Sequence, residues 1–183
     1  MTGEYNCPKW YTVTVKIKFM NKKLLLEGIL TTLETIRLQA ISAAMEAYKT
    51  ATADENVAEN KYDTLGLEAS YLAQGQAQRV AECEEDIAGY KLLEKSDISD
   101  MTSISLGALI HIVNEQGVEQ KLFLGPKAGG VTVSYHEKGV ALEFQIITSS
   151  SPIGLALLKR EEGDEFELAI GKNKHHYEII SVS

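Results

Sequence analysis

Apolar side chains recur at alternating intervals of three and four residues over two stretches of the chain, residues 26–47 and 66–90. This heptad spacing places the apolar positions on one side of an α-helix and is typical of a coiled coil. Two helices of about 30 residues are therefore predicted, each about 45 Å long at about 1.5 Å per residue. The first series is Leu26, Ile29, Leu33, Ile36, Ala40, Ala43 and Ala47, and the second is Gly66, Ala69, Ala73, Gln76, Val80, Cys83, Ile87 and Tyr90.

The size of these side chains changes in opposite directions along the two stretches. The first runs from Leu and Ile to Ala, whereas the second begins with Gly and Ala and ends with Val, Ile and Tyr. Ends of matching bulk face each other if the chain reverses direction between the two stretches. The pattern therefore predicts an antiparallel helical hairpin that becomes narrower toward its turn.

The connecting stretch, ATADENVAENKYD at residues 51–63, is strongly acidic. Carboxylates at the start of the second helix favour its dipole, so part of this charge needs no function. The pattern by itself fits a coiled-coil dimerisation arm with a solvated turn as well as a functional tip. The acidic residues are Asp54, Glu55, Glu59 and Asp63, offset by Lys61, and Asn60, Tyr62 and Asp63 are candidates to cap and staple the second helix.

After residue 101 the pattern changes to an alternation of apolar and polar positions, broken by Gly-containing turns. This pattern predicts strands joined as hairpins, hence a mostly antiparallel sheet. One short helix is predicted between strands, with Ser151 as its N-cap and Pro152 at its first position. Gly163 is predicted to stop this helix before Asp164. The predicted fold class is α+β, a helical hairpin followed by an antiparallel β-domain with a short helix.

Three parts of the chain are expected: an extension at residues 1–19, the hairpin at 20–95 and the β-domain at 96–183. Within the extension, Thr12 to Phe19 alternates like a strand that either pairs with a sheet or precedes a natural start at Met20. The second interpretation is favoured because MNKKLLLEGIL enters a helical pattern directly.

Composition narrows the function classes. With 183 residues and 44% hydrophobic content, the chain has the composition of an ordinary globular protein. The net charge of −8 argues against nonspecific binding to nucleic-acid phosphates, although a local basic face is compatible with it. Cys7 and Cys83 form neither a disulfide framework nor a zinc motif, which indicates a reducing cytoplasm. No apolar run is long enough to span a bilayer, so no membrane partner is expected.

The segment SPIGLALLKREEGDEFELAIGKNKHHYEIISV, which begins at Ser151, resembles the C-terminal signature of the bacterial Gre transcript-cleavage and elongation factors. The stretches AENKYD and LEASYLAQGQAQRVAECEE resemble the region around the hairpin turn of that family. The order of parts also matches, and the resemblance covers residues 20–183. It implies a coiled-coil hairpin followed by a domain of FKBP-like shape.

The resemblance implies that RNA polymerase core is the partner, that DNA and RNA of the elongation complex are met indirectly, and that the protein is a monomer and not itself an enzyme. The β-domain would sit at the rim of the polymerase's secondary channel while the hairpin enters it. Acidic tip residues would help hold a Mg²⁺ shared with the polymerase active site, which cuts backtracked RNA; no intrinsic cofactor is expected. The implied tip residues are Asp54, Glu55 and Glu59, and the implied binding residues are Asn56, Asn60, Tyr62, Asp63, Ser151, Pro152, Gly154, Lys159, Arg160, Gly163 and Asp164.

One departure from the family affects the implied chemistry. The family places Asp and Glu three residues apart, whereas the aligned positions here are Asn56 and Glu59. A neutral amide is a weaker Mg²⁺ ligand than a carboxylate, and Asp54 or Glu55 could substitute if the turn is shaped differently. The resemblance therefore leaves two functions open, stimulation of RNA cleavage or non-cleaving modulation of the polymerase.

Two further functions belong to other classes. An FKBP-like domain suggests a peptidyl-prolyl isomerase, which would need an aromatic-lined cleft, but fold likeness does not transfer activity. A coiled-coil adaptor would self-associate through the hairpin. Among smaller motifs, His175 and His176 are adjacent on a strand and point to opposite faces, so they are not expected to ligate one metal together. The glycine-rich GPKAGG lacks the ending of a phosphate loop, and its Lys127 could meet an acidic surface.

Overall fold

The computed structural model describes residues 22–53, 65–96, 103–137, 140–171 and 173–183. The chain divides into two compact units, one formed by Ile29–Lys91 and the other by the residues on either side of that segment. The expected extension at residues 1–19 lies outside the described residues. The first turns of helix α2 (Lys22–Thr52), up to Gly28, belong to the second of these units, and the rest of the helix belongs to the unit Ile29–Lys91.

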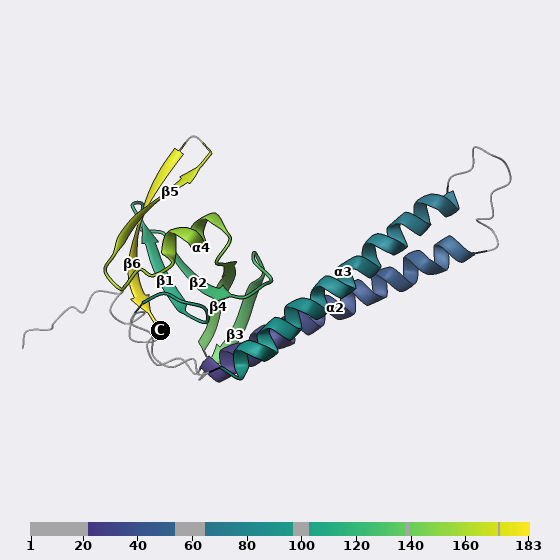
Figure 1. The fold of residues 1–183 in the computed structure, drawn as a ribbon, viewed down its shortest axis with the longest axis horizontal. Helices are drawn as coiled ribbons and strands as arrows, with labels where there is room; N and C mark the ends of the chain where they lie inside the picture. The colour runs from purple at the N-terminus through teal and green to yellow at the C-terminus, as the bar shows by residue number, and fades with distance from the viewer. Residues whose placement is uncertain (1–21, 54–64, 97–102, 138–139, 172) are drawn as a thin grey trace, which may run out of the picture. The chain divides into compact units, whose positions relative to one another are not determined.

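Helices α2 and α3 (Leu65–Glu94) form the predicted antiparallel hairpin (Figure 1). The positions of both heptad series face the partner helix and are buried or partly buried, as the pattern predicts. Ile29 and Tyr90 are fully buried, and Cys83 is 2% exposed. Toward the turn, the buried positions are occupied by Ala47 and Ala69, so small side chains fill the distal end of the helix–helix interface.

The rest of the second unit is built on one six-stranded sheet, in the order β3-β4-β2-β1-β6-β5 (Figure 1). The α+β fold class is thereby confirmed. The short helix α4 (Pro152–Leu157) lies between β4 and β5 in the sequence. The strands are β1 (Leu109–Asn114), β2 (Glu119–Gly125), β3 (Thr132–Glu137), β4 (Val140–Thr148), β5 (Glu165–Ile170) and β6 (Asn173–Val182).

The sheet is mixed rather than purely antiparallel, which corrects one feature of the sequence prediction. Strand β4 pairs antiparallel with β3, as predicted, but it also pairs parallel with β2, with Phe123 opposite Ile146. All other neighbouring strands are antiparallel. The alternation of apolar residues in β2 and β4 is the same for either direction, so the pattern could not reveal the parallel pair.

The predicted β1–β2 hairpin is confirmed, and Asn114 explains its turn. The Asn114 Oδ1 atom accepts hydrogen bonds from the backbone N–H groups of Gln116 (3.0 Å) and Val118 (2.8 Å). Gly117 has a φ of 78°, a left-handed conformation that glycine adopts at little cost. Side-chain capping of this kind is how Asn favours turns.

One face of the sheet carries a hydrophobic core that α4 helps to cover. Leu157 of α4 is fully buried in this core, and Ile153 and Ala156 pack against it. The Phe166 and Tyr177 rings stack in it with centroids 5.2 Å apart. The buried members are Ile104, Ala108, Ile110, Ile112, Leu122, Leu124, Ile147, Leu157, Phe166, Tyr177, Ile179 and Val182.

The opposite face of the sheet packs against the start of α2. A Cβ atom at Gly28 would lie 3.3 Å from Tyr135 Cβ and 3.9 Å from Val133 Cγ1. Val133 and Tyr135 are buried side chains of β3. A glycine in this turn of α2 therefore allows the helix backbone to approach the strand closely.

The predicted start of α4 is confirmed, whereas its predicted end at Gly163 is wrong. The helix ends at Leu157, with Leu158 as its C-cap. Lys159 then adopts a left-handed φ of 65°, and its N–H donates to the Ile104 carbonyl oxygen while the Arg160 carbonyl accepts from Ile104 N–H. Pairing with the segment at Ile104 replaces further helical turns, and Gly163 instead occupies a later turn with φ of 91°.

Candidate functional site

The predicted tip residues lie outside the described residues. Asp54, Glu55, Asn56, Glu59, Asn60, Tyr62 and Asp63 all fall within residues 54–64. What the structure describes is the pair of helix ends between which they lie, Thr52 of α2 and Leu65 of α3. These two helix ends lie at the same end of the hairpin (Figure 1).

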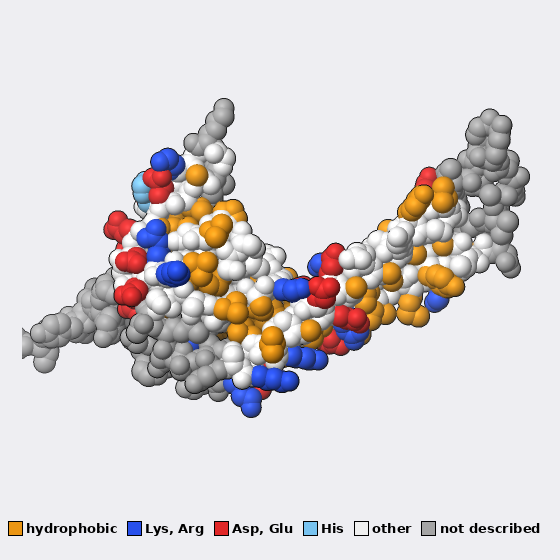
Figure 2. Space-filling model, viewed as in Figure 1, with side chains coloured by type: hydrophobic (Ala, Val, Ile, Leu, Met, Phe, Trp, Pro, Cys, Tyr) orange, Lys and Arg blue, Asp and Glu red, His pale blue; other side chains and the backbone are white. Residues whose placement is uncertain are grey.

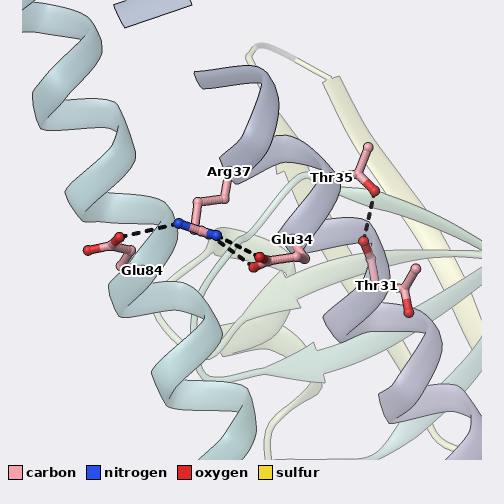
Figure 3. A network of polar contacts seen from close by, with 5 residues as sticks. All are labelled: Thr31, Glu34, Thr35, Arg37 and Glu84. Atoms are coloured by element: carbon pink, nitrogen blue, oxygen red, sulfur yellow. Dashed lines mark hydrogen bonds and ion pairs between the residues drawn. The ribbon is translucent and has the colours of Figure 1, made fainter. Parts of the chain in front are cut away.

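Arg37 links the two helices of the hairpin through a polar network (Figure 3). Its guanidinium binds Glu34 in a bidentate manner, with Nη2 to Oε1 at 2.7 Å and Nε to Oε2 at 3.0 Å. Arg37 Nη1 also lies 3.5 Å from Glu84 Oε1 on α3. The hydrogen bond from Arg37 lowers the pKa of the Glu34 carboxyl, and the same bond raises the pKa of Arg37. The network therefore ties α2 to α3 at one axial position.

The Ser151–Gly154 segment at the start of α4 has a backbone arrangement that depends on its residue types. Ser151 Oγ donates to the Thr148 carbonyl oxygen at 2.7 Å and accepts from Gly154 N–H at 3.1 Å. Pro152 occupies the first helical turn, where its missing N–H costs nothing. A Cβ atom at position 154 would lie 2.0 Å from the Thr148 carbonyl oxygen, so only glycine fits there without a backbone shift.

Arg160 is held inside its own domain. Its Nε donates to the Ala156 carbonyl oxygen at 2.6 Å, and its Nη1 donates to the Glu165 carbonyl oxygen at 2.9 Å. Its guanidinium also lies 5.7 Å from the centroid of the Phe166 ring. These contacts fix the segment between α4 and β5, which is a structural role for a residue that the resemblance implied in binding.

Gly163 and Asp164 also have contacts that stabilise the turn before β5. Gly163 N–H donates to the Ile179 carbonyl oxygen at 2.8 Å. Asp164 Oδ2 accepts a hydrogen bond from Glu161 N–H at 2.9 Å. By contrast, the side chains of Pro152, Leu155 and Lys159 are exposed, and Leu155 is 63% exposed. Of the implied binding residues in this region, Pro152 and Lys159 are therefore the two with exposed side chains suited to meet a partner.

Sequence reasoning missed a buried polar pair on the sheet, His111 and Ser181. The two residues lie opposite each other on β1 and β6, and each is 1% exposed. His111 Nε2 lies 3.1 Å from Glu119 Oε2, whereas His111 Nδ1 and Ser181 Oγ have no hydrogen-bond partner among the residues that the structure describes. Burial lowers the pKa of His111, and Glu119 partly opposes that shift. The only signal in the sequence was a histidine within the apolar run of β1.

The structure gives no support to an isomerase cleft. Such a site needs an aromatic-lined cleft, but the candidate aromatic residues are buried between 1% and 8% exposure. Two of them, Phe123 and Phe144, have ring centroids 6.1 Å apart. The candidates are Phe123, Tyr135, Phe144, Phe166 and Tyr177, all of them core residues.

The described part of the chain contains neither a candidate metal site nor a candidate membrane-spanning helix. No group of three or more His, Cys, Asp or Glu side chains there could hold a metal ion. His176 Nε2 instead lies 3.6 Å from Glu167 Oε2, and Glu167 also binds Lys174 Nζ at 2.6 Å. Within the same ranges, no helix has the length and apolar character needed to cross a membrane.

Several solved structures are similar to this chain. One of them is GreA factor homolog 1 of Thermus thermophilus, with 20% sequence identity and a TM-score of 0.34. The match covers 84% of this chain and 94% of the homolog's chain. Another is a GreA/GreB elongation factor of Nitrosomonas europaea, 21% identical with a TM-score of 0.33, covering 55% of this chain and 78% of its own.

Sequence relatives carry the family assignment. Residues 99–183 match the family described as transcription elongation factor, GreA/GreB, C-term. The transcription elongation factor GreA of Desulfovibrio desulfuricans is 31% identical, over 86% of this chain and 87% of its own length. GreA of Bartonella tribocorum is 30% identical, over 75% of this chain and 80% of its own. With this identity extending over both the hairpin and the β-domain, the chain belongs to the GreA/GreB family of transcription elongation factors.

Proposed function

We propose that this transcription elongation factor acts on RNA polymerase by placing the acidic tip of its helical hairpin in the secondary channel, where it stimulates cleavage of backtracked RNA. The polymerase performs the hydrolysis, so the factor is an accessory protein and not an enzyme. It binds polymerase core as a monomer and meets the nucleic acid only within that complex.

The observation that carries this proposal is the form of the hairpin. Helices α2 and α3 have 31 and 30 residues, which corresponds to about 45 Å of helix. Their interface is filled by small residues such as Ala47 and Ala69 near the turn, which lets the helices lie close together there. A long, narrow pair of helices can carry side chains into a channel that a globular domain cannot enter.

The residues of the turn have the chemistry that this task requires. Asp54, Glu55 and Glu59 bring carboxylate oxygens, the ligands that Mg²⁺ prefers in proteins. A Mg²⁺ ion shared with the polymerase active site would supply charge stabilisation for phosphoryl chemistry. Asn56 stands where the family has Asp, so the cleavage role falls to Glu59 together with Asp54 or Glu55.

The β-domain supplies the second part of the binding surface in this proposal. Ser151 and Gly154 hold the start of α4 against Thr148, and this arrangement presents Pro152. Lys159, exposed beyond the end of α4, adds a positive charge to the same region of the domain. Such a cation suits an acidic surface at the channel rim, and Arg160 supports the segment from inside the domain.

Stalled elongation complexes with backtracked RNA provide the test. Wild-type factor is expected to shorten the RNA from its 3′ end, whereas the double variant Glu55→Ala/Glu59→Ala is expected to bind without shortening it. A control variant, Glu94→Ala/Glu143→Ala, removes the same charge away from the tip and should retain activity. Wild-type factor that leaves the RNA intact at saturating concentration would exclude cleavage.

In that event, the neutral amide of Asn56 favours the second candidate, a non-cleaving modulator of the polymerase. It would occupy the same channel and change the rate of elongation without shortening RNA. Asn56→Asp, which restores the family's residue, should then confer cleavage on the inactive factor.

A further inference from the structure

Two polar side chains are buried in the sheet of the β-domain, His111 of β1 and Ser181 of β6, each 1% exposed. They lie opposite each other in the β1–β6 ladder. The register of that ladder shifts directly after this pair, between His111 and Ile112. An irregularity of this kind disrupts the ladder hydrogen bonds locally. The buried pair therefore lies where β6 is held to β1 less regularly than elsewhere. Figure 2 shows the hydrophobic side chains that gather on the β-domain and along the hairpin.

The ring of His111 is held toward β2 by a carboxylate. Glu119 Oε2 lies 3.1 Å from His111 Nε2. Because an ionised carboxylate only accepts hydrogen bonds, Nε2 carries the proton of the neutral ring. The Nδ1 atom is therefore the one that gains a proton at acidic pH. Among the residues that the structure describes, Nδ1 has no hydrogen-bond partner.

The groups around His111 do not fully compensate the charge that a second proton adds. Lys121 lies directly opposite His111 on β2 and carries charge of the same sign. On β6, the residue opposite is the uncharged Ser181, and Glu178 lies farther along that strand. Burial lowers the pKa of His111 most strongly, Glu119 partly opposes this shift, and Lys121 adds to it. Protonation of the ring therefore favours any movement that exposes it to water.

The strand that can move away from the ring is β6. Glu119 attracts the protonated ring to β2, whereas Ser181 brings no charge that would attract it to β6. On the other side of His111, the end of β6 is joined to β1 by two hydrogen bonds between Leu109 and Ser183, at 2.8 Å and 3.0 Å. Separation of the end of β6 from β1 therefore breaks few bonds and opens the site of His111.

The same part of β6 holds the turn before β5. Gly163 N–H donates to the Ile179 carbonyl oxygen at 2.8 Å, and Ile179 N–H donates to the Asp164 carbonyl oxygen at 2.9 Å. Ile179 lies two residues before Ser181 and opposite Ile112, at the register shift. Movement of β6 at this point therefore removes the backbone partners of the turn.

We propose that His111 is an acid-sensitive switch: protonation of its buried ring releases residues 179–183 of β6 from β1 and, with them, the turn at Gly163 and Asp164. The inference concerns the β-domain by itself and does not depend on the proposed function. In the open form the ring meets water and has the ordinary pKa of 6.5, so opening increases as the pH falls below that value.

Hydrogen–deuterium exchange of the full chain tests the switch, at about pH 7.5 and about pH 5.5, after correction for the intrinsic effect of pH on exchange. The peptides to compare cover residues 161–166 and 177–183, with residues 70–85 of α3 as the reference. In wild type, opening of both peptides should increase about threefold to tenfold at the lower pH, relative to the reference. His111→Phe should abolish this increase. The matched control His136→Phe, at an exposed position of β3, should retain it.

Glu119→Gln gives a second test that leaves the buried ring in place, because the Glu119 side chain is 42% exposed. Glu119 stabilises the protonated ring in the closed form, so its loss should make the increase in opening larger than in wild type. An increase of the same size in wild type and His111→Phe would overturn the switch. An increase in Glu119→Gln no larger than in wild type would also overturn it, as would opening of residues 177–183 that spares residues 161–166.

Discussion

The α-carbon of Gly154 lies so close to Thr148 that a Cβ atom there would stand 2.0 Å from the Thr148 carbonyl oxygen. Ser151 closes the same loop by bonding to both residues. The start of α4 is thereby fixed against the end of β4.

Gly154→Ala should therefore destabilise the β-domain by about 1–3 kcal/mol, the cost of forcing extra atoms into a filled site. Chemical denaturation followed by circular dichroism measures this change. Gly75→Ala is the matched control, because its space is open, and it should stabilise the hairpin by about 0.5–1 kcal/mol. Equal stabilities of Gly154→Ala and wild type would contradict the close approach.

The narrow end of the hairpin provides the next prediction. Ala47 is 5% exposed in the interface between α2 and α3. Ala47→Leu should push the helices apart and cost about 1–3 kcal/mol of stability. Ala81→Leu, on the exposed face, should cost little. The melting temperatures of the two variants distinguish a tight interface from a loose one. A Tm of Ala47→Leu equal to that of wild type would show that the helices are not in close contact.

Arg37 should matter more for salt dependence than for total stability. Its partners Glu34 and Glu84 are partly exposed, and surface ion pairs are screened by salt. Arg37→Ala should cause a small loss of stability at low ionic strength that disappears at high salt. Arg37→Met, which keeps most of the aliphatic stem, should show the same salt dependence. A loss that is independent of salt would mean that packing of the stem, not charge, links the helices.

Protonation of His111 should destabilise the folded protein at acidic pH. Burial lowers its pKa below the ordinary value of 6.5, so the folded state resists a proton that the unfolded state accepts. The contribution of His111 is thus fully present above pH 6.5 and is lost as the pH falls toward the lowered pKa. His111→Phe should reduce the slope of unfolding free energy against pH in this range, measured by urea denaturation at successive pH values. An unchanged slope would show that His111 does not titrate differently in the two states.

Much of this fold follows from local patterns. Ile29 and Ile87 belong to the two heptad series, one on each helix, and both are buried. Their burial could be predicted from the helical period alone. Ser151 and Pro152 similarly predict the start of α4, since capping is a local interaction.

Features decided by distant parts of the chain were not predictable in this way. The end of α4 depends on hydrogen bonds between Ile104 and the Lys159–Arg160 segment, so Gly163 was a misleading stop signal. The parallel pairing of β2 with β4 and the burial of His111 likewise depend on which strands become neighbours. For the tip, the sequence supplies the residues and their charge, and the described helices supply the position of its two ends.

The most direct measurement asks where the tip lies when the factor is bound to RNA polymerase. The probe is iron–EDTA attached to the cysteine of a Glu55→Cys variant, which also carries Cys7→Ser and keeps the buried Cys83. Iron–EDTA generates hydroxyl radicals that cut nearby chains. Insertion of the hairpin predicts cuts in the polymerase beside its catalytic Mg²⁺ and in the 3′ end of the RNA. The same probe in Lys159→Cys should cut only at the channel rim. Cuts from the Glu55→Cys probe that fall only on the outer surface of the polymerase would contradict delivery of the tip to the active site.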